Sequence, residues 1–234
     1  MASVFNPPVK QDNPDPRVAC ALLLDTSWSM DGDRITQLTT GYKAFCEAIS
    51  EDPLARKRTE VSVITFGGSV EVATPFREGR DLEPVTFSAG GATPMGEALE
   101  VGLEQLRARK EEYKTAGLEY FRPWLFIITD GSPTDGQRFV RAAKSVREAE
   151  AAKAVTVFAV GVGYADLSTL SELSALRQPV ALDGVKFYEL FLWLSSSMSV
   201  VSQSSAFGSS DRSVAANEAT EQVPLPSPVG WAKW

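Results

Sequence analysis

Histidine is absent from this sequence, and cysteine is scarce. The lack of histidine among the 234 residues excludes a Ser-His-Asp or Cys-His catalytic relay and any zinc site built on imidazole. The two cysteines, Cys20 and Cys46, cannot complete a structural zinc site alone, and we expect them to be buried and unreactive. A Cys20–Cys46 disulfide is the alternative, which an oxidising compartment would favour. The sequence also lacks the Gly-rich loop with Lys-Ser/Thr that holds nucleotide phosphates. Oxygen ligands or surface shape therefore remain as the basis of function.

Basic residues are in the minority, and no long apolar run is present. The sequence has 23 Lys and Arg against 30 Asp and Glu, for a net charge of -7 and a pI near 4.8. A nucleic-acid partner would need a basic face, so we expect none. There is no N-terminal basic-then-apolar signal and no apolar run of about 18 residues, the length that spans a bilayer. We therefore expect neither secretion nor membrane contact, and a cytoplasmic location.

Oxygen-bearing side chains follow or precede the strongest structural patterns. The run 18–24 is entirely apolar, which is typical of a buried strand in a parallel sheet, and the run 124–128 has the same character. Five side chains stand after these runs or at the start of a helical pattern: Asp25, Ser27, Ser29, Thr93 and Asp130. Open α/β sheets bind ligands outside the carboxyl ends of their strands. The pattern therefore favours a hard divalent cation held by oxygen alone.

The rest of the sequence alternates between strand and helix patterns. Further strands are expected at 60–66, 70–76, 155–162 and 179–182, and helices at 33–52, 94–106, 139–146, 166–176 and 187–201. Gly67-Gly68 permits a tight hairpin, which would add one antiparallel edge strand. This alternation predicts an α/β fold: a doubly wound, mostly parallel central sheet with helices on both faces.

Both ends of the chain differ in composition from the middle. We expect an N-terminal arm at 1–16, one domain at 17–202 and a Ser/Pro-rich tail at 203–234. The tail ends in a segment that contains Trp231 and Trp234. These indoles either fold back onto the domain or form a tethered docking motif for a partner protein.

The oxygen-bearing motifs also carry a family resemblance. Asp-x-Ser-x-Ser at 25–29, the separate Thr93 and the later Thr-Asp-Gly at 129–131 resemble the metal-ion-dependent adhesion site of von Willebrand factor A domains. Longer segments resemble the bacterial tellurite-resistance (TerY-like) branch over roughly residues 15 to 202, namely 54–58, 90–96 and 120–124. The resemblance implies the strand order 3-2-1-4-5-6, with the site at the switch point of the sheet.

This resemblance also implies a ligand set and a function. The hydroxyls of Ser27, Ser29 and Thr93 would bind Mg²⁺ directly, with Mn²⁺ or Ca²⁺ as alternatives. Asp25 and Asp130 would act mainly through bound waters and hydrogen bonds. An open coordination position would accept an acidic side chain of a partner protein, such as an associated protein phosphatase or kinase. The implied role is a metal-dependent adaptor in a stress-response signalling system.

Other interpretations of the same residues stay open. The chain could be a structural or oligomerising scaffold with a degenerate metal site. A Mg²⁺-dependent phosphohydrolase is less favoured, because aspartate-nucleophile enzymes need a second acid where Ser27 stands, so we do not expect an enzyme. Asp33 and Asp135 are interpreted as helix caps or loop residues. Trp28 departs from the glycine common in the family, and it could contact a partner, shield the site or pack inward.

Overall fold

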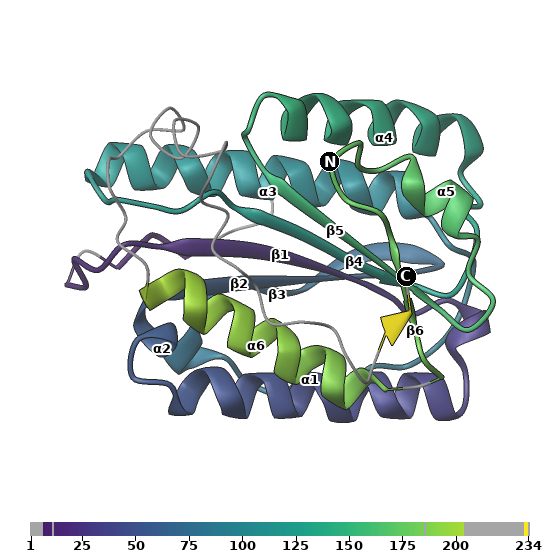
Figure 1. Ribbon diagram of the computed structural model, residues 1–234, viewed down its shortest axis with the longest axis horizontal. Helices are drawn as coiled ribbons and strands as arrows, with labels where there is room; N and C mark the ends of the chain where they lie inside the picture. The colour runs from purple at the N-terminus through teal and green to yellow at the C-terminus, as the bar shows by residue number, and fades with distance from the viewer. Residues whose placement is uncertain (1–6, 11, 185, 204–231, 234) are drawn as a thin grey trace.

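The central element of the molecule is a twisted sheet enclosed by two layers of helices (Figure 1). The computed structural model describes residues 7–10, 12–184, 186–203 and 232–233. Within them the sheet has seven strands in the order β3-β2-β1-β4-β5-β6-β7. The strands are β1 (Val18–Asp25), β2 (Thr59–Gly67), β3 (Ser69–Glu78), β4 (Trp124–Thr129), β5 (Thr156–Val162), β6 (Val180–Leu182) and β7 (Ala232–Lys233).

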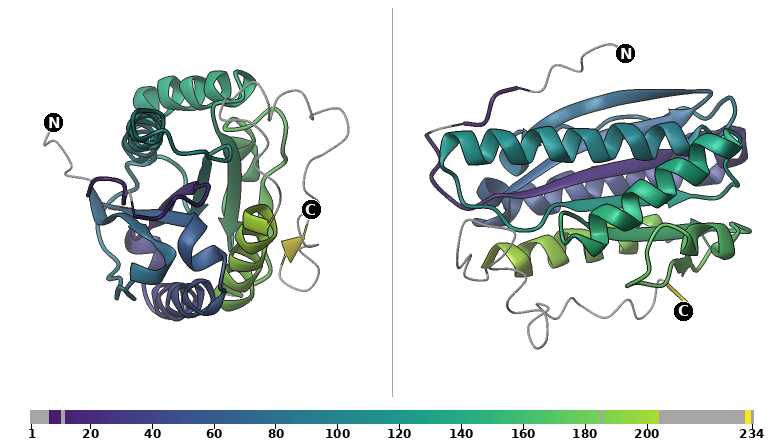
Figure 2. Two further views of the ribbon diagram at one scale, coloured as in Figure 1. Left: turned by 90° about the vertical axis from the view of Figure 1, so that its left-hand side faces the viewer. Right: turned by 90° about the horizontal axis from the view of Figure 1, so that it is seen from above.

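The helices divide between the two faces of this sheet (Figures 1 and 2). They are α1 (Asp33–Glu51), α2 (Ala55–Arg58), α3 (Met95–Ala116), α4 (Gly136–Ala151), α5 (Leu167–Ser171) and α6 (Phe187–Gln203), with short 3₁₀ turns at Trp28–Met30 and Gly79–Asp81. Helices α1 and α6 pack together on one face, and α3 and α4 pack together on the other. Among the described residues, no helix is both long and apolar enough to cross a membrane.

The predicted topology is confirmed. Strands β2, β1, β4, β5 and β6 are parallel to one another, and β3 pairs with β2 as the expected antiparallel hairpin. The order 3-2-1-4-5-6 is also the observed one. A second antiparallel strand, β7, pairs with β6 at the other edge and was not predicted. A two-residue strand has no periodicity from which to predict it.

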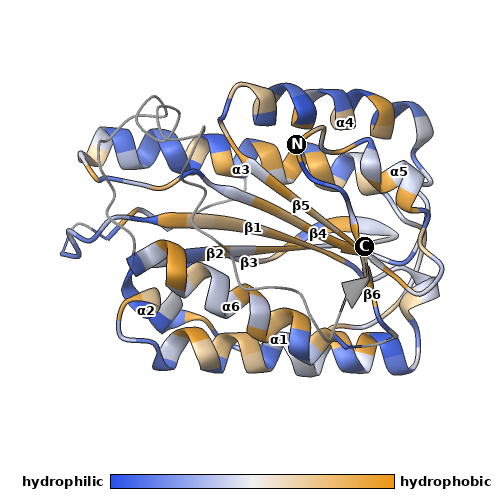
Figure 3. Ribbon diagram, viewed as in Figure 1, coloured by the Kyte–Doolittle hydropathy of each residue, from blue (hydrophilic) through white to orange (hydrophobic). Residues whose placement is uncertain are grey.

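Strand β1 is buried on both faces, which explains its unbroken apolar sequence. One side of β1 packs against α1 and α6, and its members are Val18, Cys20, Leu22 and Leu24. The other side packs against α3 and α4, and its members are Ala19, Ala21 and Leu23. Figure 3 shows the same apolar character along the neighbouring strands. This double burial fixes the register of β1 and so the position of Asp25 at its end.

Several local predictions can be compared with the structure. Cys20 and Cys46 are free and buried, so the disulfide alternative is wrong, and burial raises the pKa of Cys46 to about 11. Helix α3 continues to Ala116, beyond the predicted helix at 94–106. Asp33 is the first residue of α1 and not its cap, because Gly32 holds the N-cap position with φ +78°. Trp231 and Trp234 lie outside the described residues, and the domain boundaries remain predictions.

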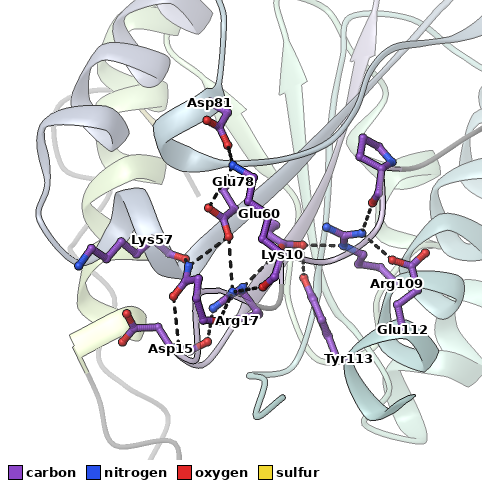
Figure 4. Close-up of polar contacts among 12 residues, drawn as sticks. Lys10, Asp15, Arg17, Lys57, Glu60, Glu78, Asp81, Arg109, Glu112 and Tyr113 are labelled. Carbon is purple, nitrogen blue, oxygen red and sulfur yellow. Dashed lines mark hydrogen bonds and ion pairs between the residues drawn. The ribbon is translucent and has the colours of Figure 1, made fainter. Parts of the chain in front are cut away.

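A buried ionic network closes the sheet at the N-terminal ends of β1 and β2 (Figure 4). Arg17 Nε donates to Glu60 Oε1 at 3.3 Å, and Glu60 Oε2 accepts from Arg109 Nε and Tyr113 Oη, each at 2.6 Å. A further bond joins Arg17 Nη2 to Glu78 Oε1 at 3.4 Å. Burial, reinforced by the negative charge of Glu60, raises the pKa of Tyr113 well above its ordinary value. Each carboxylate of this network therefore meets at least one cation.

The same network anchors the described part of the N-terminal arm. Asn13 Nδ2 donates to Lys57 O at 2.8 Å and to Glu78 Oε1 at 3.1 Å. Arg109 Nη1 donates to Pro7 O at 2.7 Å. Asn13 is buried despite its polarity, since its amide is satisfied by these partners. The segment before β1 is thus held by polar contacts with α2, α3 and the β2–β3 hairpin.

Candidate functional site

The five predicted site residues meet at the carboxyl end of the sheet, opposite the ionic network. Asp25 ends β1, and Asp130 follows the last residue of the adjacent strand β4. After β1 the chain passes to α1 on one face of the sheet, whereas after β4 it passes to α4 on the other face. This divergence is the topological switch point, where open α/β sheets form their ligand sites.

A chain of hydroxyls connects the β1 loop to the end of β4. Ser29 Oγ donates to Asp130 Oδ1 at 2.5 Å, and the Oγ atoms of Ser27 and Ser29 lie 2.9 Å apart. Because the Ser29 hydroxyl has one proton and donates it to Asp130, Ser27 must be the donor to Ser29. Ser27 Oγ then keeps both of its lone pairs, and Ser29 Oγ keeps the one that does not accept from Ser27, so each oxygen can still bind a cation.

Asp25 is fully buried and has neutral donors on both of its oxygens. Oδ1 accepts from the backbone N–H of Ser27 at 2.8 Å, and Oδ2 accepts from Thr129 Oγ1 at 2.5 Å. Burial raises the pKa of Asp25 above its usual value, and the negative charge of Asp130 adds to this, although the hydrogen bonds from Ser27 and Thr129 oppose the shift. A nearby cation would relieve the cost of keeping this carboxylate ionised.

The loop that carries Thr93 is held against the ends of β1 and β2 by backbone contacts. Trp28 N donates to Gly91 O at 3.1 Å, and Gly90 N donates to Thr26 O at 2.8 Å. At Gly91, φ is +74° and a Cβ would overlap the backbone of Gly68, so only glycine fits there. Gly91 therefore allows the two backbones to approach closely.

Thr93 is held from a second side by the start of α4. Thr93 N donates to Thr134 Oγ1 at 3.1 Å, and Thr134 N donates to Thr93 O at 2.9 Å. The carboxylate of Asp135 accepts from Gly96 N at 3.1 Å and from Glu97 N at 2.9 Å. Asp135 is therefore a capping residue as predicted, but the free N–H groups it satisfies belong to α3.

Gly131 shows how closely the candidate ligands surround one point. A Cβ built on Gly131 would lie 3.4 Å from Thr93 Oγ1, 3.7 Å from Ser29 Oγ and 3.9 Å from Asp25 Oδ2. Oxygens from two separate chain segments, residues 25–29 and the loop with Thr93, thus converge beside the Gly131 backbone. The structure brings together all five residues that the sequence predicts for the site.

These residues fit a small oxygen-seeking cation. Magnesium binds octahedrally at about 2.1 Å, which puts neighbouring ligands roughly 3 Å apart. The Oγ atoms of Ser27 and Ser29 already lie 2.9 Å apart. Among the described residues, no group of three or more Asp, Glu, Cys or His side chains could hold a metal. Any cation here would therefore depend on the hydroxyls, with two carboxylates nearby to offset its charge.

Two residues at the site were missed in the sequence. Thr129 bonds to Asp25 Oδ2, and Arg34 Nη1 donates to Asp130 Oδ2 and to Ser29 O. Thr129 directly precedes Asp130 in the Thr-Asp-Gly motif, so this position could have identified it as a site residue. Arg34 gave no signal, because its contact joins α1 to a residue 96 positions away in the chain.

Two aromatic side chains are exposed near the carboxyl ends of the strands. Trp28 lies in the loop after β1 and is 68% exposed, so the inward-packing alternative for its indole does not describe this structure. Tyr164 follows the end of β5 and is 97% exposed. Both residues follow the carboxyl ends of strands, at the same end of the sheet as the five site residues.

Comparisons with known proteins agree with this fold. The sequence matches the model of the von Willebrand factor type A domain over residues 20–183, and no curated protein matches it. The open form of the pilus adhesin SpaC from Lactobacillus rhamnosus GG is 15% identical with a TM-score of 0.65, and the match covers 80% of this chain and 30% of SpaC. The chain thus spans less than a third of that adhesin.

Two further solved structures carry a metal in their descriptions. Proximal thread matrix protein 1 from the mussel byssus, with a zinc-occupied metal-ion-dependent adhesion site, is 17% identical with a TM-score of 0.52 over 78% of this chain and 48% of that one. Manganese-loaded TRAP protein from Plasmodium vivax is 18% identical with a TM-score of 0.53 over 75% of this chain and 73% of that one. At these identities the likeness shows the fold alone.

Proposed function

The chain belongs to the von Willebrand factor type A domain family, and from this premise we propose that it is a metal-dependent protein-binding module. The observation that carries the proposal is the convergence of Ser29, Thr93 and Asp25 around the backbone of Gly131. Structural relatives described as zinc-occupied or manganese-loaded support a divalent cation at this place in the fold.

The residues divide into ligands and supporting groups. The hydroxyls of Ser27, Ser29 and Thr93 would hold the cation, with Mg²⁺ as the first choice and Mn²⁺ or Ca²⁺ as alternatives. Asp25 and Asp130 are already engaged by hydrogen bonds, so they orient the site and offset its charge. A cation with neutral direct ligands keeps more of its charge for an acidic side chain from a partner protein.

The surface around the site suits a protein partner. Ser29 and Trp28 are exposed at its rim, so an incoming carboxylate could reach the cation while Trp28 contacts the surrounding chain. Aromatic residues are enriched among those that dominate binding energy at interfaces. Following the resemblance to the TerY-like branch, we place the chain in the cytoplasm as an adaptor of a stress-response system, with a protein phosphatase or kinase as its partner class. No side chain at the site suggests tellurium chemistry.

Affinity capture in two buffers tests this function. Immobilised wild type, Thr93→Ala and Thr40→Ala are exposed to cell extract in Mg²⁺ or in EDTA. Thr40 is an exposed threonine of α1, so it controls for the loss of a hydroxyl. We expect a partner retained by the wild type and Thr40→Ala only in Mg²⁺. Equal retention in EDTA and by Thr93→Ala would contradict a metal-dependent module.

A structural scaffold is the second candidate, and its support is the extensive buried network at the other end of the sheet. It predicts partner binding or self-association that does not respond to metal. An enzyme is not proposed, since the site has two carboxylates engaged by hydrogen bonds and no histidine to act as a base. Turnover of a generic phosphate ester by the metal-loaded protein would reverse that position.

A further inference from the structure

Arg34 brings a fixed positive charge to the candidate metal site. It lies in the first turn of α1, and its side chain is 30% exposed. Its Nη1 donates to Asp130 Oδ2 at 2.5 Å and to the backbone oxygen of Ser29 at 2.8 Å. A guanidinium so close to the ligands of a dication opposes binding of that dication, because like charges repel.

The positive charge of Arg34 matters because it is paired with the buried carboxylate of Asp130. The Asp130 side chain is only 1% exposed, and both of its oxygens are engaged, Oδ1 by Ser29 and Oδ2 by Arg34. A buried carboxylate left without a cation is strongly destabilising. In the metal-free protein, Arg34 supplies the positive charge that Asp130 requires.

The guanidinium is also packed in place. A Cβ built on Gly163, the residue after β5, would lie 2.8 Å from Arg34 Nη2 and 3.3 Å from its Cζ. Gly163 also has φ +61°, a conformation that favours glycine. Contacts with three chain segments, after β1, β4 and β5, therefore limit how far Arg34 can withdraw when a metal binds.

We propose that Arg34 is a built-in counter-cation, which holds Asp130 and Ser29 in place before metal binds and thereby lowers the affinity of the site for divalent cations. The proposal rests on the proposed function, because it needs a metal at Ser27, Ser29 and Thr93. The single charge of the Arg34 guanidinium and the double charge of a cation about 6 Å away would repel each other, even in water, enough to weaken metal binding roughly tenfold. The site would then fill only at a raised metal concentration, or when a partner carboxylate adds its negative charge.

Titration of the EDTA-stripped protein with Mg²⁺ and Mn²⁺ tests this role, with thermal unfolding as a second readout. Arg34→Gln removes the charge, and Arg34→Lys keeps it. Lys43→Gln removes one positive charge from an exposed position on the same helix, so it controls for net charge. We expect Arg34→Gln to bind metal about tenfold more tightly and to melt at a lower temperature without metal. Arg34→Lys and Lys43→Gln should stay within about threefold of the wild type.

The possible results separate the two proposals. Wild type that binds metal while Arg34→Gln binds equally or more weakly would overturn the role of Arg34 and leave the proposed function intact. If Arg34→Lys raised the metal affinity as much as Arg34→Gln, the role of Arg34 would also be overturned, because the loss of charge would not be the cause. Metal binding by Arg34→Gln but not by the wild type would support it. If neither binds metal, both proposals fail.

Discussion

The two ends of the central sheet both bury charged side chains, but they satisfy them in different ways. At the N-terminal ends of β1 and β2, Glu60 accepts from Arg17, Arg109 and Tyr113, all of them buried. At the carboxyl ends, Arg34 pairs with Asp130, but the buried Asp25 receives only an amide and a hydroxyl. At the N-terminal ends, buried cations balance the charge of Glu60. At the carboxyl ends, neutral donors offset the charge of Asp25 only in part.

This difference separates a structural network from a ligand site. The ionic network has no solvent-facing hydroxyls, and its members tie the N-terminal arm, α3 and the hairpin together. The candidate metal site instead presents the exposed Ser29 beside Thr93 at the Gly131 backbone. Loss of a residue should therefore reduce stability at the first end and ligand affinity at the second.

The largest expected effect is on stability, from Glu60→Gln. The change removes the carboxylate but leaves the buried charges of Arg17 and Arg109 without their common partner. Breaking a buried ion pair from one side costs about 3–5 kcal/mol, so the free energy of unfolding should fall by that amount in urea denaturation. Glu112→Gln is the control, because it removes a partly exposed partner of the same Arg109 and should cost at most about 1 kcal/mol. Equal effects of the two variants would contradict a structural role for the buried network.

The next largest effect is on metal affinity, from Asp25→Ala or Asp130→Ala. Loss of groups that support metal ligands commonly weakens binding by about 10–100-fold, and we expect that range in calorimetric titration with Mg²⁺. The fold should survive, since the site lies at the ends of the strands and outside the two apolar cores. Variants that unfold both with and without EDTA would show that these residues serve the fold instead.

The smallest expected effect is on stability, from Trp28→Ala. Because the Trp28 indole is 68% exposed, its loss should change the free energy of unfolding by less than about 0.5 kcal/mol and leave metal affinity unchanged. Trp124→Ala removes an indole that is 4% exposed and should cost about 3–5 kcal/mol. If Trp28 contacts the partner, Trp28→Ala should also reduce the amount of partner captured in Mg²⁺. Unchanged capture would remove Trp28 from the interface.

The sequence predicted those parts of the molecule that follow from local patterns. The apolar run before Asp25, the hairpin at Gly67-Gly68 and the alternation of helices with strands each depend on neighbouring residues, and the structure has all three. The five site residues were predictable for the same reason, since each stands at the end of such a pattern. Their proximity in the fold then follows from the rule that parallel strands have their carboxyl ends, and the ligand site, at the same end of the sheet.

What could not be predicted depends on contacts between distant parts of the chain. Arg34 is 96 residues from Asp130, and Glu60 meets Arg17 and Arg109 from separate elements. A charged residue on a helix or at a strand end has no periodicity that identifies its partner. The polar chemistry of both ends, including the counter-charge at the metal site, was therefore visible only in three dimensions.

The most direct test of the central claim is a calorimetric titration of the EDTA-stripped wild type with Mg²⁺ and Mn²⁺, beside Thr93→Ala. Thr93 contributes a candidate ligand from a segment far from β1, so its loss tests whether the separate segments form one site. We predict saturable binding at a single site in the wild type that Thr93→Ala loses, while Thr40→Ala binds normally. Wild type that binds neither metal, or Thr93→Ala that binds as well as the wild type, would contradict a metal site at this end of the sheet.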